Sequence, residues 1–408
     1  MLEKFIENKI NYKIINLFKR SFVLVIVFAI VLLYFFNSQY GIFSNIQQAL
    51  IPQIEDARVV TIEHSIYKDT IYSYSGTKFE KKVKIHEIEH LPNWSVNASK
   101  VDNDSNLIMI IPNNLNEFSN PRFNAEIIAY NLQSQEQIVI GQDADLMIKP
   151  LFDAKNKTVY YRSTSNMGET KLIKYNLNTR MKNTVFKTNT AMALFPIMSN
   201  DNVLYVIKYN NQGSKLIEIS DMEIKEIIHI SDHFIRDWSI NTEKNKLMYI
   251  EQKPSNKSLQ YIVKILDIKN KEYVDLNFEK NSFSFQNEFL SIAGNTGNEY
   301  TETINYFQPT WVGANEIAFG SHSDLIQIEQ PINIFNFKHS TIAKHERPIN
   351  GFDTPISLDQ KRGNMLIKNI QPDMNYLEKI FVSNNEYKTR FPIESENLII
   401  YANWWYVN

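Results

Sequence analysis

The sequence predicts an all-β fold: a β-propeller of about seven four-stranded blades, its closing blade shared by both chain ends, preceded by one transmembrane helix. Three observations predict it: a charge-free apolar run near the N-terminus, short period-two runs beyond residue 55, and one strand pattern that recurs along the chain. With 43% hydrophobic and 12% aromatic residues among 408, the chain has ample material for a sizeable core.

Residues 21–36 read SFVLVIVFAIVLLYFF and carry no charge. As a helix they cover about 24 Å, close to the ~30 Å of a bilayer core. Basic side chains stand before this run and none follows it until Arg58. The positive-inside rule therefore predicts a cytoplasmic tail over residues 1–20, and contact with the lipid bilayer through residues 21–36.

The same run has an alternative interpretation as a cleaved signal peptide, because it is only slightly longer than a typical apolar signal region. The following stretch, NSQYGIFSNIQQAL, offers no small-x-small cleavage site, and the region before the run is long. We therefore expect an uncleaved signal-anchor, a tether over residues 37–56, and an extracytoplasmic domain, periplasmic or at the cell surface, over residues 57–408.

Beyond residue 55, short runs alternate at period two and are rich in Ile, Val, Tyr, Phe and Thr, as in VVTIEHSIY, NLIMII, TVYYRS and KLMYIEQ. Turn clusters such as DNDSN, DAKNK and NTEKNK separate them. This pattern is typical of an all-β domain with many short strands.

The strands are also ordered at a longer period, in which Pro or Trp precedes a polar turn and a strongly apolar strand. Three of the five Trp residues stand two places after the equivalent position. Most intervals lie near the ~40–50 residues of one propeller blade, and the two longest contain the insertions 113–124 and 278–299. The equivalent positions are Pro92, Pro150, Pro196, Arg236, Pro309, Pro355 and Pro392.

Closure of the ring is predicted from the strands at the two ends of the domain, which do not form a complete blade on their own. Residues 56–91 contain two or three strands without an equivalent position, and the chain after Pro392 has room for one or two more. Together they make one blade, which gives seven. Six blades result if the closing blade is miscounted, and eight if residues 236–309 contain a full one.

The repeat resembles that of the TolB-like, WD-type β-propellers, over about residues 92–401. The resemblance rests on apolar strands such as EIAFGS and TVYYRS and on second strands such as KYNLNTR, AYNLQSQ and ILDIKNK. The usual Ser-Pro-Asp-Gly turn of that family is replaced by VNAS, DAKN, MSND, INTE, VGAN and LDQK. The resemblance implies a propeller that serves as a periplasmic interaction platform or as a module attached to a peptidase, and it assigns no individual residue.

One formal catalytic motif is present, the HExxH pattern of His86, Glu87 and His90. On a helix this spacing binds zinc and supplies a general base. Here alternating Val83 and Ile85 precede the motif and Pro92 follows it, which predicts a strand. On a strand, positions four apart are separated by about 13 Å, too far for two ligands of one zinc ion. We therefore expect edge-strand residues and no metal.

Two acidic segments are further candidates. Asp102, Asn103 and Asp104 resemble the opening of a calcium loop, but Leu107 and Asn113 stand where Gly and Glu are required, so a turn is expected. Asp143 and Asp145 either face a channel mouth or belong to a loop between blades.

The C-terminal aromatic residues Trp404, Trp405 and Tyr406 are the weak candidates for a binding surface, because Trp and Tyr are enriched at interfaces. The alternative is that they complete the closing blade and pack against a neighbouring blade.

Composition excludes several functions. The chain has no Cys, which excludes disulfides, thiolate metal sites and a cysteine nucleophile, and 43 basic against 45 acidic residues leave no surplus for nucleic acid. No Gly-x-Ser-x-Gly or phosphate-binding loop is present.

We therefore expect no cofactor and no catalysis, and a platform that binds another envelope protein or polymer. The alternatives are a propeller hydrolase or lyase acting on saccharides or peptides at the channel mouth, and a ligand sensor that signals through the helix.

Overall fold

The computed structural model describes residues 57–112, 122–274 and 309–407, with short gaps at residues 166–167, 190–192, 201–202, 221–222, 234, 255–258, 321–330, 340, 346–347, 349, 360, 372–376 and 385–388. All of the described residues belong to one compact unit. Among them there is no helix with the length and apolarity needed to cross a membrane. The predicted tail, anchor and tether, residues 1–56, lie outside the described residues. Residues 113–121 of the first insertion and the whole of the second insertion also lie outside them.

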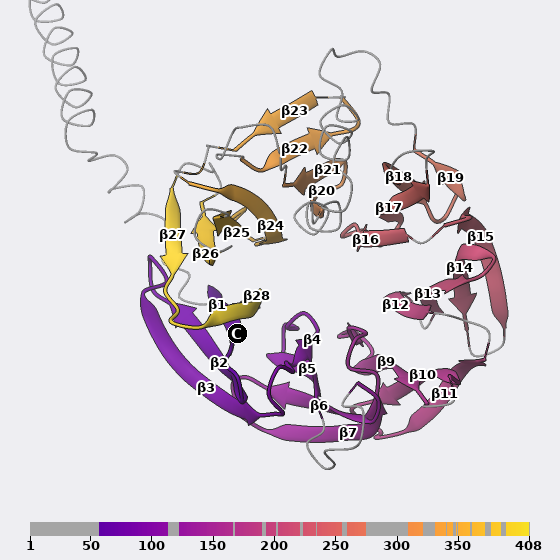
Figure 1. The fold of residues 1–408 in the computed structure, drawn as a ribbon, viewed down its shortest axis with the longest axis horizontal. Coiled ribbons are helices and arrows are strands. Elements are labelled where there is room, and N and C mark those ends of the chain that lie inside the picture. Colours follow the sequence, from indigo (N-terminus) through magenta and orange to yellow (C-terminus); the bar gives the residue numbers. More distant parts are fainter. Residues whose placement is uncertain are drawn as a thin grey trace, which may run out of the picture. The chain divides into compact units, whose positions relative to one another are not determined.

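The described residues form seven four-stranded antiparallel sheets arranged as a ring (Figure 1). We number them as blades 1 to 7. In blades 2 to 7 the four strands follow one another in sequence order, from the first strand to the outermost. The predicted all-β propeller of seven blades is therefore confirmed for the described part of the chain.

The strand bounds of the first four blades are as follows. Blade 1 consists of β28 (Leu398–Tyr406), β1 (Ala57–His64), β2 (Lys68–Ser75) and β3 (Lys81–Glu89). Blade 2 consists of β4 (Asn97–Ala98), β5 (Asn106–Ile111), β6 (Ala125–Asn131) and β7 (Gln137–Ala144). Blade 3 consists of β8 (Leu151–Asp153), β9 (Thr158–Thr164), β10 (Thr170–Asn176) and β11 (Lys182–Thr188). Blade 4 consists of β12 (Ala193–Asn200), β13 (Val203–Asn210), β14 (Gly213–Ile219) and β15 (Ile224–Ser231).

The remaining blades follow in the same order. Blade 5 consists of β16 (Ile235–Ile240), β17 (Lys246–Pro254), β18 (Leu259–Asp267) and β19 (Glu272–Tyr273). Blade 6 consists of β20 (Thr310–Gly313), β21 (Glu316–Phe319), β22 (Asn333–Asn336) and β23 (Thr341–Lys344). Blade 7 consists of β24 (Phe352–Leu358), β25 (Met365–Gln371), β26 (Leu377–Ser383) and β27 (Arg390–Ile393).

Blade 1 closes the ring with one strand from the C-terminus and three from the N-terminal part of the described chain. β28 pairs antiparallel with β1 from Ala57↔Tyr406 to His64↔Leu398, with one bulge after Ile62. The shared closing blade predicted from the sequence is thus confirmed. The blade leaves no unpaired edge inside the ring at β1, and this is the usual means by which a propeller protects its strand edges.

One of the seven repeat positions was assigned wrongly. The first six stand in or shortly before the first strand of a blade, as Pro150 does before β8 and Pro355 does within β24. Pro392 instead lies in β27, the outermost strand of blade 7, where it pairs with Phe381. The first strand of the closing blade is β28, which begins six residues later, at Leu398. The blade count survives because β28 belongs to blade 1 in either assignment.

The turns between the first two strands of a blade are stabilised without the Ser-Pro-Asp-Gly sequence. A buried Asx side chain accepts backbone N–H groups in the turn between the first two strands: Asp102 Oδ1 accepts from Asn106 N at 2.6 Å, and Asn241 Oδ1 accepts from Lys246 N at 2.8 Å. Such a bond replaces part of the backbone bonding of a tight turn. In blade 2 the turn is DNDSN, and VNAS contributes β4 instead.

The turn after the third strand uses the same chemistry. Asn131 Oδ1 accepts from Ser134 N at 2.8 Å, and Asn176 Oδ1 accepts from Thr179 N at 2.9 Å. Asn336 repeats the arrangement in blade 6, with His339 N at 3.1 Å. The "YNLNT" element of the sequence repeat is therefore a third strand followed by an Asx turn.

The core lies between adjacent blades rather than at one centre. One cluster joins blades 1 and 2 through fully buried Val60, Leu107 and Met109, and Trp405 is 3% exposed beside them. Comparable clusters join blade 2 to 3, 3 to 4, 4 to 5, 6 to 7 and 7 to 1. Blades 1, 2, 3, 4 and 7 therefore each bury apolar side chains on both faces, which a single four-stranded sheet cannot do alone.

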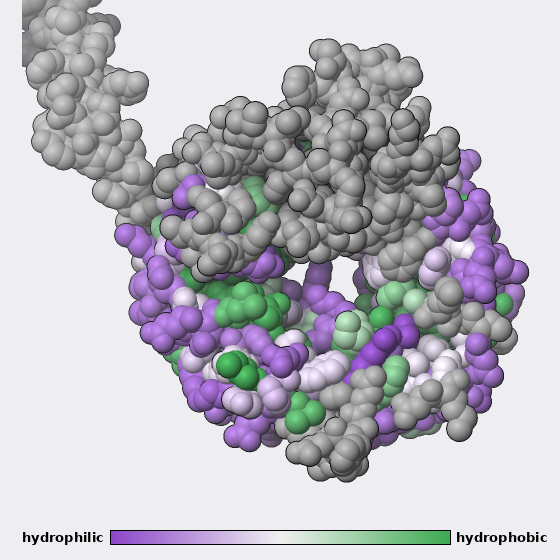
Figure 2. Space-filling view, viewed as in Figure 1, coloured by the Kyte–Doolittle hydropathy of each residue, from purple (hydrophilic) through white to green (hydrophobic). Residues whose placement is uncertain are grey.

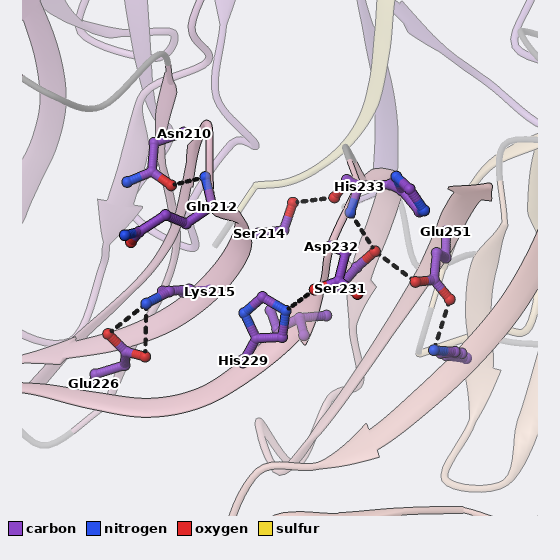
Figure 3. A network of polar contacts seen from close by, with 12 residues as sticks. Asn210, Gln212, Ser214, Lys215, Glu226, His229, Ser231, Asp232, His233 and Glu251 are labelled. Atoms are coloured by element: carbon purple, nitrogen blue, oxygen red, sulfur yellow. Dashed lines mark hydrogen bonds and ion pairs between the residues drawn. The ribbon is translucent and has the colours of Figure 1, made fainter. Parts of the chain in front are cut away.

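A polar link accompanies the apolar contact between blades 4 and 5 (Figure 3). Ser231 Oγ, at the end of β15, donates to Glu251 Oε1 of β17 at 2.5 Å, and Lys264 Nζ lies 2.6 Å from Oε2. Burial raises the pKa of Glu251, but the hydrogen bonds from Lys264 and Ser231 outweigh it and leave the pKa lowered. The buried carboxylate is therefore satisfied as an anion and joins two blades.

Candidate functional site

The HExxH segment, residues 86–90, lies on β3 and just beyond it, so the predicted edge strand is confirmed. The His86 ring stacks on Tyr130 of blade 2, with ring centroids 4.7 Å apart. Glu87 is bound at the surface by Lys84 Nζ at 2.6 Å. The residues of the motif therefore serve different contacts and do not converge on a shared ion.

His90 instead joins two residues from elsewhere in blade 1. His64 Nδ1 lies 2.7 Å from Asp69 Oδ1, and His90 Nε2 lies 3.1 Å from the same oxygen. The other oxygen, Oδ2, accepts the backbone N–H of Val96 at 2.7 Å. The side chains of Asp69 and His90 are fully buried, and that of His64 is 22% exposed. We call His64, Asp69 and His90 the His-Asp-His cluster.

The calcium-like segment forms a turn, as expected. Asp102 Oδ1 accepts the backbone N–H groups of Asp104 and Asn106, and Lys157 Nζ of blade 3 lies 3.0 Å from Oδ2. Lys157 also pairs with the Asp104 carboxylate. An ammonium group thus neutralises both acids, and the pair links blade 2 to blade 3.

Asp143 lies in strand β7 rather than in the expected loop between blades, and Asp145 directly follows that strand; both residues contact blade 3. Asp143 Oδ1 accepts from Tyr161 Oη and from Lys182 Nζ, each at 2.8 Å. Asp145 is fully buried, and Arg162 Nη2 lies 3.1 Å from its Oδ2. Both carboxylates are committed to structural contacts.

The C-terminal aromatic side chains complete the closing blade. Trp404 and Trp405 are each 3% exposed. Trp404 Nε1 donates to Ser357 O of blade 7 at 3.3 Å, whereas Trp405 Nε1 donates to Ser105 Oγ of blade 2 at 2.9 Å. Tyr406 is half-buried beside them. The structure thus places these residues in contact with both neighbouring blades, and a binding role for them stays a prediction.

Two lysines stand beside the first strands of adjacent blades. Lys100 follows β4, and Lys149 precedes β8. Water reaches both side chains, yet desolvation lowers both pKa values, and the charge of Lys100 lowers that of Lys149 further. Figure 2 shows the opening in the middle of the ring, with hydrophilic and hydrophobic residues along the coloured part of its border.

Neither the lysine pair nor the complete His-Asp-His cluster was predicted from the sequence. His64 and Asp69 flank the hairpin turn HSIYKD, so the β1–β2 pairing gave a signal for their contact. No local pattern brings His90 to them. The lysines come from separate blades at different offsets from the repeat positions, and only the ring brings them together.

Another buried polar group lies between blades 6 and 7. Asp353 is fully buried on β24, and Arg390 Nη1 of β27 lies 2.7 Å from its Oδ2. His345, 4% exposed, follows β23. Burial, together with the Arg390 charge, lowers the pKa of His345 to about 3.

Acid is expected to destabilise the protein through His345. Its pKa of about 3 in the folded state lies below the unfolded value of 6.5, so only the unfolded chain gains a proton as pH falls from 6.5. The stabilisation is complete above pH 6.5 and is lost as pH falls toward 3, by about 2 kcal/mol between pH 7 and pH 5. Urea unfolding at the two pH values measures it.

The variant His345→Gln is expected to reduce this difference, whereas His339→Gln, at an exposed turn position, is expected to preserve it. An unchanged pH dependence in His345→Gln would contradict the assignment.

Comparison with known proteins gives the fold. No family model and no curated protein matches the chain. TolB from Acinetobacter baumannii is 12% identical, with a TM-score of 0.44 over 75% of this chain and 68% of that one. The β-propeller domain of the Trilobed protease from Pyrococcus furiosus is 11% identical, with a TM-score of 0.50 over 84% and 95%. A structure from a study of two prolyl endopeptidases is 9% identical, with a TM-score of 0.51 over 91% of this chain and 55% of that one, so this chain spans about half of its length. The likeness to the latter two structures, with TM-scores of 0.50 and 0.51, shows the β-propeller fold.

Proposed function

We propose that the chain is a membrane-anchored, extracytoplasmic β-propeller that acts as a binding platform. Its partner is another envelope protein or polymer that presents an anionic group to the central opening. The observation that carries the proposal is the pair Lys100 and Lys149, two solvent-accessible ammonium groups from adjacent blades, neither of which has an ion pair with a described residue.

Lys100 and Lys149 have no anionic partner among the described residues that would balance their two positive charges. Desolvation lowers both pKa values, and repulsion by the charge of Lys100 lowers the pKa of Lys149 further. Two carboxylates on first strands are committed elsewhere: Asp153 accepts from Ser199 Oγ at 2.9 Å, and Asp353 pairs with Arg390. An anion that bridges the two lysines would relieve this repulsion.

The other charged groups support binding rather than catalysis. The acids singled out from the sequence, Asp102, Asp143 and Asp145, are each bound by a cationic side chain from blade 3. These ion pairs hold the three carboxylates in contacts between blades 2 and 3.

The lysine pair can be tested on the full-length chain with fluorescent dextran sulfate as an anionic probe. We expect Lys100→Gln/Lys149→Gln to weaken binding by about tenfold or more, since two charge-assisted contacts are lost. Lys225→Gln/Lys269→Gln removes two exposed lysines from the outer part of the ring and is expected to bind normally. Equal affinities of the two double variants would overturn the proposal.

Two further measurements belong to the same test. Alkaline-washed membranes are expected to retain the full-length chain and to release a chain that lacks residues 21–36. Crosslinking in intact cells is expected to capture an envelope component with the native chain and less of it with the Lys100/Lys149 variant.

The enzyme alternative draws on one observation, the His-Asp-His cluster, since a hydrolase or lyase is expected to gather histidine and acidic side chains. Turnover in a screen of saccharides and peptides would favour this alternative over the platform.

A further inference from the structure

We propose that His64, Asp69 and His90 form a site for one divalent transition-metal ion of the zinc type in blade 1, where that blade meets blade 2. The inference is independent of the proposed binding platform. It also departs from the expectation, drawn from the sequence, that the chain holds no metal.

The three ligand groups converge from three strands of one sheet. His64 ends β1, Asp69 is the second residue of β2, and His90 follows the last residue of β3. His64 and Asp69 are direct partners across the β1–β2 hairpin. One nitrogen from each imidazole and one carboxylate oxygen all lie within 4.8 Å of one another.

The carboxylate of Asp69 is held in a fixed orientation. Its Oδ2 accepts the backbone N–H of Val96 at 2.7 Å, and Val96 belongs to the segment that leads into blade 2. Oδ1 is left to face both imidazoles, at 2.7 Å from His64 and 3.1 Å from His90. An outer hydrogen bond that orients a ligand in this way is typical of metal sites.

His90 supplies the argument for a cation. Its Nδ1 lies 2.9 Å from Leu91 O, and because a carbonyl oxygen only accepts, Nδ1 carries the proton of that hydrogen bond. In a neutral ring Nε2 then presents a lone pair. This atom is buried and has no well-aligned hydrogen bond, although Asp69 Oδ1 is 3.1 Å away. Two electron-rich atoms face one another, and a cation between them would satisfy both.

The second imidazole brings another nitrogen ligand to the same carboxylate oxygen. The His64 and His90 rings are stacked, with centroids 5.4 Å apart and an interplanar angle of 13°. One divalent ion can be shared by two neutral imidazole nitrogens and the carboxylate.

The donor set matches zinc in kind and number. Two imidazole nitrogens and one carboxylate oxygen occur together in zinc sites, with bonds of about 2.0–2.2 Å and a further position for water. Such bonds place tetrahedral ligands about 3.3 Å apart, so the His64–Asp69 contact of 2.7 Å must open slightly. His64 is the one ligand that reaches solvent, at 22% exposure, and it gives the ion an entry path.

The expected consequence of metal binding is structural. Glu87, the formal base of the HExxH pattern, is held at the surface by Lys68 and Lys84. A metal at the cluster would join the three N-terminal strands of the closing blade and, through Val96, the start of blade 2. We therefore expect the ion to stabilise the folded ring.

The experiment uses the full-length protein, freed of metal with a chelator and titrated with ZnCl2 and, separately, with CoCl2. We expect one equivalent of zinc to bind and to raise the melting temperature, and Co²⁺ to give the visible absorption of a site with nitrogen ligands. Asp69→Asn and His90→Gln are expected to weaken zinc binding by more than about 100-fold, beyond the 10–100-fold cost of losing an outer partner.

Two further variants keep the test decisive. His64→Gln alters the partly exposed ligand and provides a test if the buried variants fail to fold. His229→Gln is the matched control, because His229 pairs with Asp232 at 2.8 Å on the surface and neither belongs to a group of three metal-ligating side chains among the described residues (Figure 3). Zinc binding by the native chain that all three cluster variants retain, or no binding of Zn²⁺ or Co²⁺ by the native chain, would overturn the proposal and leave a buried imidazolium–carboxylate pair.

Discussion

A chain that ends before Leu398 is expected to lose its single cooperative unfolding transition, because the truncation removes all of β28. The strand pairs with β1 along its length and carries two Trp side chains that are 3% exposed. Truncating one buried Trp side chain costs about 3–5 kcal/mol, and a whole domain is stable by only about 5–15 kcal/mol. Calorimetry or urea unfolding of the truncated chain tests the result.

The loss of β28 affects both sides of the ring. Tyr401 Oη donates to Ser99 O of blade 2 at 2.7 Å, and Tyr406 Oη donates to Asp359 Oδ1 of blade 7, also at 2.7 Å. A synthetic peptide of residues 398–408, added to the truncated chain, is expected to restore part of the transition, whereas a scrambled peptide is not. A truncated chain that unfolds at the native midpoint with the native slope would contradict the role of β28.

The variant Arg390→Gln is expected to destabilise the fold by about 3–5 kcal/mol, because it leaves a buried carboxylate without its counter-charge. Asp353 is fully buried, and its remaining described partner is Asn369, whose Nδ2 donates to Oδ1 at 2.8 Å. Burial already raises the pKa of Asp353 even with Arg390 and Asn369 beside it. The free energy of unfolding at pH 7 measures the cost.

The double variant Asp353→Asn/Arg390→Gln separates the charge from the packing. It is expected to recover most of the loss, since a neutral amide needs no counter-charge. The cost of Arg390→Gln alone should also shrink as pH falls from 7 toward 4. An acid whose folded pKa is raised above 3.8 takes up its proton in the folded state first, and protonation removes the unpaired charge. A cost that is equal at both pH values and persists in the double variant would refute this account.

The fold was largely predictable because each repeat consists of short local patterns that can be recognised in the sequence. Alternating strands recur in each blade and Asx turns in most of them, and a buried Asp such as Asp153 or Asp359 accepts backbone N–H groups in the turn between the first two strands. Pro392 was misassigned for the same reason. It also precedes a polar turn and an apolar strand, so local pattern alone does not distinguish an outermost strand from a first strand.

The candidate sites were less predictable because they depend on contacts between strands. Pro92 and the Val83/Ile85 alternation correctly identified a strand at residues 81–89, and that excluded the helical zinc motif. His90 meets His64 and Asp69 only through the order of strands in blade 1. Lys100 and Lys149 belong to different blades, and a single sequence contains no signal for their separation in the ring.

The shared closing blade also determines when its strands can pair during translation. β1 is translated before the six other blades and its partner β28 after them, so one edge of β1 stays unpaired while those blades are translated. That edge, ARVVTIEH, contains fully buried Val59, Val60 and Ile62. Unpaired apolar edges favour strand exchange and aggregation, and contacts so distant in sequence form slowly. The nascent chain thus has a long interval in which a chaperone, or a second copy offering its own β28, competes for the same edge.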